Sequence, residues 1–565
     1  MGKNKAVAKS DKYDKAKLGT DIINVINYIF LFAFLTIYPL VFRIKGQSVS
    51  EKYYFNITRT RYEFFIYLSI GYILLIIVAY IFEGVWTYYN KRKSIMSTKD
   101  DYIVTPERFM WIFILANFLA YLMAVLDDGL ISSDVAFYGT DARYMGFLSY
   151  FIMGFSFVML SRYADVKLPI FSAFGATTFF SYLVAICQHI DFDLSRFKNE
   201  SYKPTGIKAL FEIFPRYLFR LRNGIKKAQY NVFISTFGNI NIFASFVVIS
   251  LAVFICMYVF TDKLFYRIMS GVIITMGGIV IMIANSDSAY IGMCAVCFFL
   301  FLLAYRQGLL LRFVQGIILM SIGNLCVVLL NKYISEVMGK SYDKRGGFAQ
   351  ALDRLGLALI LVVLIVLIYI FMRLVNHFFV EKLEGINKNK VITCILAASA
   401  ALLITIIIIG HTRHIPAFTF NYKWGTFRGY IWTKSYELFC DAPLMNKLFG
   451  YGNGSVKTLM NTYYYDEMVA VTNKVYDNAH NELLQYLLTT GLLGMFSYIG
   501  LCVTSFVYIL KNSHGRVIAY MCLSAILGYF VQGLININQP ITTPFMFLFM
   551  ALGVGYVRYL KVEER

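Results

Sequence analysis

One histidine lies where a polar stretch of the chain passes into an apolar one. His480 stands in the sequence DNAHNELL, with Asp477, Asn478, Asn481 and Glu482 within three residues of it. An imidazole titrates near neutral pH and can therefore accept a proton from an attacking hydroxyl group. The alternative, which position alone favours, is a histidine that caps a helix or lies at a membrane interface. The segments described below favour the first interpretation, and His480 is predicted to be a catalytic base.

An arginine upstream of His480 could hold the substrate. Arg428 lies between Trp424 and Trp432, with Lys423 and Lys434 close by. The planar guanidinium can grip a diphosphate with two hydrogen bonds, whereas a lysine offers only a point charge. An arginine that faces solvent or lipid headgroups is the alternative interpretation. Arg428 is predicted to be the second catalytic residue.

Four other segments could complete such a site. GYGNG, from Gly450 to Gly454, predicts a tight turn and could also cradle a phosphate. FGNINIFA and NSDSAY each lead into an apolar run, where their polar residues either cap a helix or leave backbone amides for a phosphate. The stretch 216–231 interleaves basic residues with Tyr and Leu, which is typical of an amphipathic helix at a membrane surface and could gather lipid phosphates. The predicted substrate-binding residues are Lys423, Trp424, Trp432, Lys434, Gly450, Gly452, Asn481, Asn239, Asn241, Ser288, Arg220 and Arg222.

The elements that must position these residues are membrane helices. The chain has 565 residues, of which 58% are hydrophobic and 15% charged. Apolar runs of about 20 residues let a helix cross the hydrocarbon with its backbone hydrogen bonds satisfied internally. The sequence therefore predicts an all-α, polytopic transmembrane protein. About fourteen spans are expected, beginning near Ile22, Phe64, Phe109, Phe147, Pro169, Ile242, Phe265, Ser288, Leu311, Leu355, Ile392, Leu483, Val517 and Pro540.

The distribution of lysine and arginine predicts the orientation of these spans. Basic connections such as 511–516 belong on the cytoplasmic side, and the acidic connection 127–143 belongs on the outer side. The outer loops 43–63 and 189–241 break this pattern, which suggests that some of their basic residues have another role. Both termini are then cytoplasmic, and the large outer loop lies between the eleventh and twelfth spans. The expected regions are a cytoplasmic basic tail (1–20), a first transmembrane part (21–410), an extracytoplasmic loop that carries the catalytic residues (411–481) and a last transmembrane part (482–565).

Charge narrows the classes of function. The formal net charge of +20 lies mostly in loops and tail, and no compact basic domain stands apart from the spans. Membrane lipids are therefore expected partners, and nucleic acid is not. A transporter needs ionisable residues near the middle of the membrane, and these are scarce here; a flippase for lipid-linked oligosaccharides stays the alternative function. A metal-dependent glycosyltransferase would need acidic residues in the first outer loop, which offers only Glu51 and Glu63.

An ordered set of motifs resembles one family. HN at 480–481, followed by Gly491 and Gly494, is similar to the signature of the O-antigen ligase and O-antigen polymerase family. FRGYIWTKSYELFCDAPLMNKLFGYGNG resembles the arginine–tryptophan–proline–glycine segment of that family. FGNINIFA resembles its Gly-Asn-x-Asn start of a span, and FVQGLININQP resembles the end of its penultimate span. The resemblance covers roughly residues 230–300 and 420–555.

The resemblance implies a function. Members of this family are metal-independent inverting glycosyltransferases with a GT-C-like fold in the bacterial cytoplasmic (inner) membrane, and they use no cofactor. The implied donor is a glycan on undecaprenyl pyrophosphate, and the implied acceptor is a polysaccharide or another hydroxyl-bearing glycan on the outer face, with a chain-length regulator as a further partner. The resemblance implies that His480 activates the acceptor hydroxyl and that Arg428 contacts the pyrophosphate. Ligase and polymerase both stay open, although the large loop and extra spans favour a polymerase.

One departure from the family pattern concerns a second arginine. Many members have Ser-Arg-Gly at the outer start of a span where this chain has Ser288-Ala289-Tyr290. Either another basic residue makes the second phosphate contact, or this segment corresponds to a different part of the family. The candidates for that contact are Arg220, Arg222, Lys226 and Arg345. The resemblance also implies one extra helical hairpin before the large loop, which would leave the orientation of the later spans unchanged.

Overall fold

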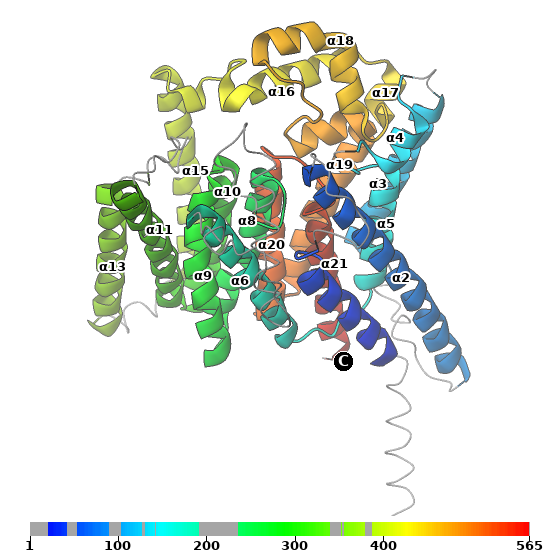
Figure 1. The fold of residues 1–565 in the computed structure, drawn as a ribbon. Coiled ribbons are helices and arrows are strands. Elements are labelled where there is room, and N and C mark those ends of the chain that lie inside the picture. Colours follow the sequence, from blue (N-terminus) through cyan, green and yellow to red (C-terminus); the bar gives the residue numbers. More distant parts are fainter. Residues whose placement is uncertain are drawn as a thin grey trace, which may run out of the picture.

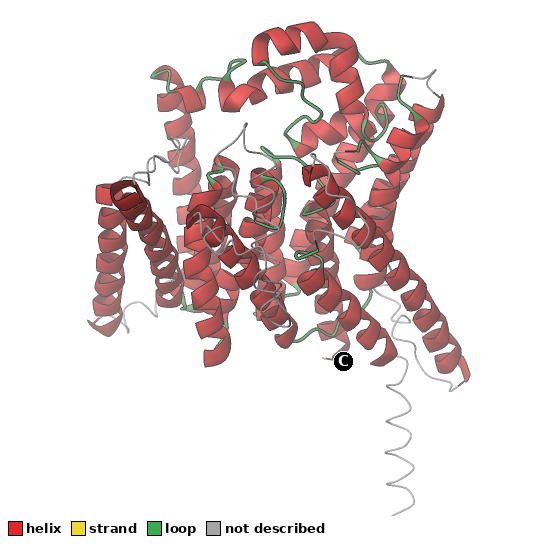
Figure 2. Cartoon of the chain, in the orientation of Figure 1, coloured by secondary structure: helices red, strands yellow, loops and turns green. Residues whose placement is uncertain are grey.

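The computed structural model describes residues 21–41, 53–89, 103–126, 130–141, 143–190, 235–338, 352, 355–378 and 387–563. Every regular element among these residues is a helix, as Figure 2 shows. The prediction of an all-α protein is therefore confirmed.

The helices follow the predicted apolar runs. After an apolar helix at Asp21–Ile37, the chain forms α2 (Tyr53–Tyr89), α3 (Thr105–Leu126), α4 (Ser133–Tyr138), α5 (Phe147–Leu160), α6 (Pro169–Ile190), α8 (Ile240–Phe260), α9 (Leu264–Ala284), α10 (Asp287–Gln307), α11 (Leu310–Met338), α13 (Leu355–Phe378), α15 (Lys388–Thr412), η3 (Pro416–Phe418), α16 (Trp424–Asp441), α17 (Leu444–Phe449), α18 (Ser455–Thr472), α19 (Glu482–Lys511), α20 (Val517–Gly533) and α21 (Thr543–Glu563). Figure 1 shows them as one bundle with a layer of helices across one end.

Eleven helices in the described part of the chain are long and apolar enough to cross a membrane. Three further apolar helices are shorter: Asp21–Ile37, Phe147–Leu160 and Val517–Gly533. Each of the fourteen predicted starts falls in or next to one of these helices. The chain is a polytopic membrane protein; the count of about fourteen spans and their orientation stay predictions.

The centre of the bundle is α8, since 94% of its most apolar stretch of 18 residues is buried inside the protein. α9, α10 and α20 pack around it. Glycines let neighbouring helices approach closely: a β-carbon at Gly292 of α10 would lie 2.9 Å from the carbonyl oxygen of Gly528 in α20. At the edge of the bundle, only 6% of the corresponding stretch of α13 is buried, and none of that of α15 is buried. These two helices present their apolar side chains outward, as lipid-facing helices do.

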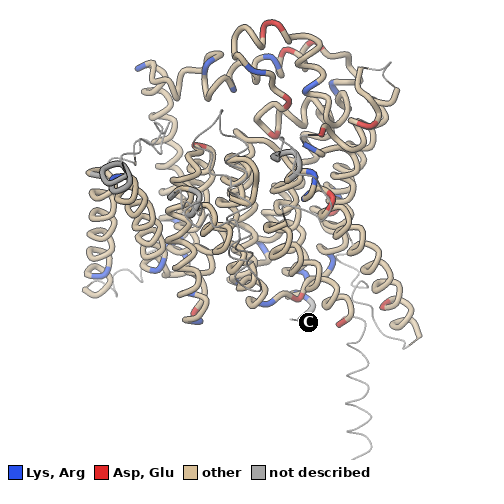
Figure 3. The backbone as a smooth tube through the Cα atoms, viewed as in Figure 1, with Lys and Arg blue, Asp and Glu red and all other residues tan. Residues whose placement is uncertain are grey.

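Charged residues lie mainly at the two ends of the bundle and in the helical layer, as Figure 3 shows. At the end opposite that layer, Glu107 of α3 is buried and accepts a hydrogen bond from Arg558 of α21 (2.7 Å) and from Ser161 (3.0 Å). At the other end, Arg61 of α2 is fully buried and donates to the carbonyls of Pro39 (2.5 Å) and Thr236 (2.7 Å). This basic residue of the expected outer loop therefore ties three chain segments together.

The layer across the end of the bundle is formed by α16, α17 and α18, and we call it the cap (Figure 1). The region 411–481 is therefore largely helical and not an extended loop. Its apolar residues recur at helical spacing, which lets one face of each helix be buried. They form a small core with one residue of α19: Tyr430, Ile431, Leu438, Val456, Leu459, Met460, Met468 and Leu488. The cap is thus anchored on the helix that follows His480.

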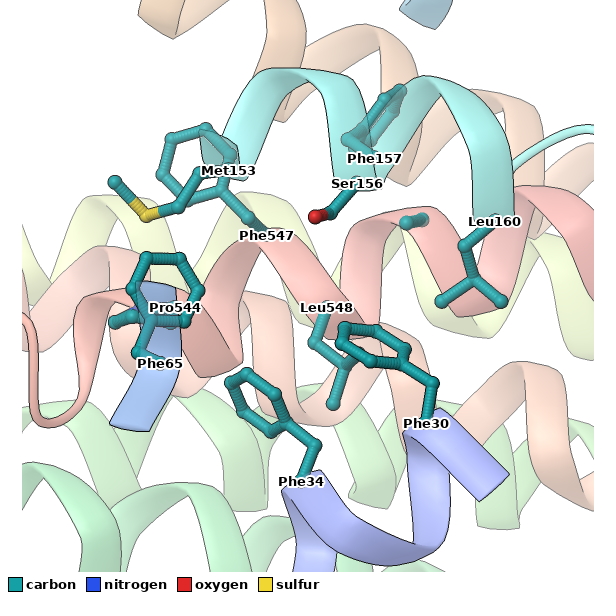
Figure 4. Close-up of a pocket in the computed structure, with 11 residues that line it drawn as sticks. Phe30, Phe34, Phe65, Met153, Ser156, Phe157, Leu160, Pro544, Phe547 and Leu548 are labelled. Atoms are coloured by element: carbon teal, nitrogen blue, oxygen red, sulfur yellow. The ribbon is translucent and has the colours of Figure 1, made fainter. Parts of the chain in front are cut away.

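A small apolar cavity lies inside the bundle between the first apolar helix, α2, α5 and α21 (Figure 4). Phe30 and Phe34 line it from the first apolar helix, Phe65 from α2, Phe157 from α5 and Leu548 from α21. Its lining contains no charged side chain, and Ser156 is its one polar residue. The candidate site lies instead where the cap meets the bundle.

Candidate functional site

His480 lies in the linker 473–481 between α18 and α19, in a backbone conformation that is unusual for histidine. Its φ angle is +51°, in the left-handed region that costs a residue with a β-carbon about 1–2 kcal/mol. Such a conformation persists where the surroundings hold it. Here the His480 backbone amide donates to Asn478 Oδ1 (2.8 Å), and the Ala479 amide donates to Gln485 Oε1 (3.0 Å).

The imidazole of His480 is mostly buried and stands edge-on to the ring of Tyr476, with the ring centroids 5.7 Å apart at an angle of 82°. Its Nδ1 atom is buried and has no hydrogen-bond partner among the described residues. Burial lowers the pKa of His480 to about 3, helped by the positive charges of Arg428 and Arg143 and opposed by Asp477. The imidazole is therefore neutral near pH 7 and can accept a proton.

Arg428 lies near the start of α16, directly after three residues with positive φ angles: Gly425, Thr426 and Phe427. Its Nη1 donates to the Gly425 carbonyl (3.3 Å), and its buried Nε has no partner among the described residues. Burial lowers the pKa of Arg428, whereas the nearby charge of Asp287 at the start of α10 and Tyr476 raise it. A guanidinium always stays charged at neutral pH, so the site holds a half-buried cation whose buried Nε donor is unused among the described residues.

His480 and Arg428 therefore lie close enough to interact electrostatically. The charge of Arg428 acts on the imidazole, and Tyr476 interacts with both residues. The charge of Asp287, at the start of α10, also acts on Arg428. The candidate site is thus a junction of the cap, the linker 473–481 and one end of the bundle.

The segments that carry the other motifs meet at this same end through buried hydrogen bonds. Asn478 donates to Asn538 Oδ1 (3.3 Å), and Asn538 donates to the Tyr150 hydroxyl (2.8 Å). Asn536 donates to the Asn241 carbonyl (3.1 Å). The linker before α19, the linker between α20 and α21, and the start of α8 are therefore fixed relative to one another.

The start of α10 joins this network as well. Ser286 donates to Asn241 Oδ1 (3.3 Å) and shares a hydrogen bond with Ser288 (2.8 Å), which accepts a hydrogen bond from Gln532 (3.3 Å). Ser288 and Asn241 thus have partners inside the protein. Their prediction as substrate contacts stays untested, and the contacts present give them a role in joining helices.

The two predicted asparagines at helix starts act as caps. Asn481 Oδ1 accepts the amides of Leu483 (2.9 Å) and Leu484 (3.1 Å). Asn239 Oδ1 likewise accepts the amides of Asn241 (2.8 Å) and Ile242 (3.4 Å). Each cap satisfies amide groups that the helix itself cannot satisfy.

The GYGNG segment packs against the first part of α19, just before Gly491 of the HN signature. The amides of Tyr451 and Gly452 donate to the carbonyls of Leu488 (2.9 Å) and Thr489 (3.0 Å). A β-carbon at Gly450 would lie 2.3 Å from the Thr489 carbonyl carbon. Gly491, with φ of +64°, interrupts the helical backbone of α19 at this contact. Gly450 and Gly452 thus dock the cap on α19.

The remaining predicted residues differ in their surroundings. Lys423 is exposed at the start of α16. Trp424 donates through Nε1 to the Ala417 carbonyl (2.9 Å) and packs against Trp432, with ring centroids 5.1 Å apart. Lys434 is buried away from solvent. Arg220 and Arg222 lie outside the described residues, as do Lys226 and Arg345.

Lys434 is held by two carboxylates. Its Nζ lies 3.0 Å from Glu437 and 3.1 Å from Glu467 of α18, and 4.7 Å from the centroid of the Tyr464 ring. Its ammonium charge is therefore already compensated within the cap. As a substrate contact Lys434 stays untested, and its pairs connect α16 to α18.

Two residues near His480 were missed by the sequence analysis. Arg143, in the linker before α5, pairs with Asp477, and its charge reaches His480. Glu482 is buried and accepts hydrogen bonds from the hydroxyls of Tyr498 (2.8 Å) and Tyr529 (2.6 Å). The pairing of Arg143 with Asp477 could not be predicted from the local sequence, because the two residues are 334 positions apart. The position of Glu482 beside the HN signature was the one available signal.

The structure offers no metal-binding cluster of three or more His, Cys, Asp or Glu within the residues it describes. In a comparison with protein families, residues 345–499 match the family model described as O-antigen ligase. No curated protein matches the chain in sequence. The match includes the cap, Arg428, His480 and the first part of α19. The predicted resemblance is therefore confirmed over this stretch: the chain carries an O-antigen ligase family domain at residues 345–499.

Proposed function

We propose that the protein is a glycosyltransferase that moves a glycan from a polyprenyl diphosphate carrier to a hydroxyl acceptor, and so ligates or polymerises surface polysaccharide. The observation that carries this proposal is a half-buried, neutral imidazole that feels the charge of a half-buried guanidinium whose buried Nε has no partner among the described residues, both inside the family match. The family implies glycan ligation or polymerisation and lipid-linked glycan substrates. Undecaprenyl pyrophosphate is the carrier that the resemblance implies.

The two residues divide the chemistry between them. The acceptor oxygen attacks the anomeric carbon from the face opposite the diphosphate, and His480 takes the hydroxyl proton as the new C–O bond forms. The bond between the anomeric carbon and the diphosphate oxygen breaks, and the electron pair leaves with the diphosphate. Arg428 stabilises the charge that develops there. General-base assistance of this kind contributes roughly 10²- to 10⁴-fold in rate.

The low pKa of His480 fits this sequence of events once the donor is bound. A base with a pKa near 3 accepts a proton weakly at pH 7, and the charge of Arg428 is one cause of the low value. A diphosphate on Arg428 would compensate that charge and raise the pKa of the imidazole. Binding of the donor would thus make His480 a stronger base toward the acceptor hydroxyl.

The surroundings suit a lipid-borne donor. The apolar helices can hold the carrier in the membrane while the glycan reaches the cap at the end of the bundle. We infer that this end faces outward in the cytoplasmic membrane of a bacterium, because short connections that carry basic residues, such as 161–167, 305–312 and 511–516, lie at the other end.

The test uses the full-length protein in phosphatidylethanolamine and phosphatidylglycerol vesicles. The probe is the lipid-linked glycan fraction extracted from cells that lack this chain, and the readouts are released polyprenyl diphosphate and glycan length. Wild type should release the diphosphate with EDTA present, and His480→Gln should not. Turnover by His480→Gln would contradict the proposal, and so would glycan translocation without transfer. Single repeats in the deletion strain indicate a polymerase, and full-length unattached polymer indicates a ligase.

A further inference from the structure

An ion pair joins the linker of His480 to a distant part of the bundle. Arg143, in the linker between α4 and α5, directs two nitrogens at the carboxylate of Asp477: Nη2 lies 2.7 Å from Oδ1, and Nε lies 3.1 Å from Oδ2. This two-point contact fixes the orientation of both groups. The side chains are 15% and 25% exposed, so solvent screens the pair only in part.

The pair completes the attachment of the linker that carries His480. Asp477 is held by Arg143, Asn478 by Asn538, and the amide of Ala479 by Gln485. Asn481 caps α19. Every residue that flanks His480 between positions 477 and 481 is therefore tied to a neighbouring element, which is the arrangement that keeps a functional side chain in one geometry.

We propose that Arg143 and Asp477 are a positioning pair for His480: their ion pair fixes the linker so that the imidazole faces the donor, and their opposite charges balance the charge at the ring. Neither residue touches the reacting atoms in this proposal. The inference rests on the proposed function, in which His480 is the base.

The two members of the pair act on His480 in opposite directions. Arg143 in the α4–α5 linker and Arg428 in the cap lower the pKa of the imidazole, whereas Asp477 in its own linker raises it. Glu482 is bound by the hydroxyls of Tyr498 and Tyr529. Removal of the two charges of the pair should therefore move the protonation of His480 in opposite directions, which a purely structural ion pair would not do.

The experiment compares Asp477→Asn with Arg143→Gln in the vesicle assay described above. Each variant should lower kcat about 10²-fold, the loss expected when a catalytic group is misplaced by about 1 Å, with KM for the lipid-linked glycans within about threefold. In a plot of kcat/KM against pH, the fall on the acid side (the acid limb) reports protonation of His480. This acid limb should move to lower pH in Asp477→Asn and to higher pH in Arg143→Gln. The exchanged pair Arg143→Asp with Asp477→Arg should recover part of kcat.

A matched control is the ion pair between Arg312 and Asp262 (2.8 Å), which lies at the other end of α8. Asp262→Asn should change neither kcat nor the acid limb. Wild-type kcat in folded Asp477→Asn, or equal losses in both variants with an unmoved acid limb, would overturn the positioning pair. If His480→Gln turns over normally, the proposed function fails; if only the Arg143 and Asp477 variants do, the positioning pair alone fails.

Discussion

Gly491 of α19 faces the backbone of Leu448 at the end of α17: a β-carbon at position 491 would lie 2.4 Å from the Leu448 carbonyl carbon. The chain therefore needs a glycine here for two reasons, the close approach and the positive φ of +64°. This contact explains why a glycine follows HN at this distance in the sequence. It is the point where the cap is docked on the helix that His480 precedes.

Gly491→Ala should lower both the melting temperature and the turnover, because the new methyl group must push α17 away and the cap carries Arg428. Backbone strain alone costs about 1–3 kcal/mol, and the clash adds to it. Gly308→Ala is the control, since Gly308 also has a positive φ, of +73°, but open space around its α-carbon. It should show only the smaller loss of stability and normal turnover per folded molecule. Equal effects from the two substitutions in thermal unfolding and in the vesicle assay would contradict the docking contact.

Arg428→Ala should reduce donor use more than Arg428→Lys, because lysine keeps the charge and loses the planar two-point grip. We expect losses in kcat/KM of about 10²- to 10³-fold for alanine, the range for removal of a donor to a developing anion, and a smaller loss for lysine. Released polyprenyl diphosphate measures both. Lys457→Ala, at an exposed lysine of α18, is the control and should behave like wild type. Near-normal activity of both Arg428 variants would remove this residue from the site.

The buried neutral His480 should make the protein sensitive to acid. Its pKa is about 3 in the folded state and near 6.5 when unfolded, so the unfolded chain binds the extra proton as the pH falls between these values. The stability present above pH 6.5 is then lost progressively down to about pH 3. The melting temperature should therefore drop less between pH 7.5 and pH 5.0 in His480→Gln than in wild type. His377→Gln, at an exposed site at the end of α13, should match wild type, and the same drop in all three proteins would count against the buried neutral state.

Asn481 offers a test of capping against substrate binding. Asn481→Ala should cost about 1 kcal/mol of stability through the loss of the cap on α19, whereas Asn481→Ser should keep most of it. The serine variant should also keep most of the activity if capping is the main role. Asn239→Ser, at the matching cap of α8, should behave alike. Normal stability together with lost turnover in Asn481→Ser would instead indicate a substrate contact.

The local pattern of the chain was enough to predict the helices, and it also named the residues of the proposed site, which stay predictions. Apolar runs of membrane-spanning length produce helices wherever they occur, because a backbone in lipid must satisfy its own hydrogen bonds. His480 and Arg428 could be named because few side chains can serve as a base or grip a diphosphate, and because both belong to an ordered motif. The family match at 345–499 confirms that part of the resemblance; the parts at 230–300 and beyond residue 499 stay predictions.

Partners that come from distant elements could not be predicted. One example is the ion pair of Lys434 with Glu467 of the next cap helix; the prediction that Lys434 binds substrate stays untested. The packing of the connection 411–481 into a helical cap also depends on a distant element, because its apolar residues bury one another and Leu488 of α19.

The sequence by itself determined that this is a helical membrane protein, and it led to the prediction that His480 and Arg428 form the site. Only the tertiary structure decided that Arg143 pairs with Asp477 across 334 positions and that Gly491 contacts the backbone of Leu448 in the cap. The physical reason is that helix formation depends on neighbours along the chain, whereas a side chain's hydrogen bonds and charge balance depend on which helices pack together.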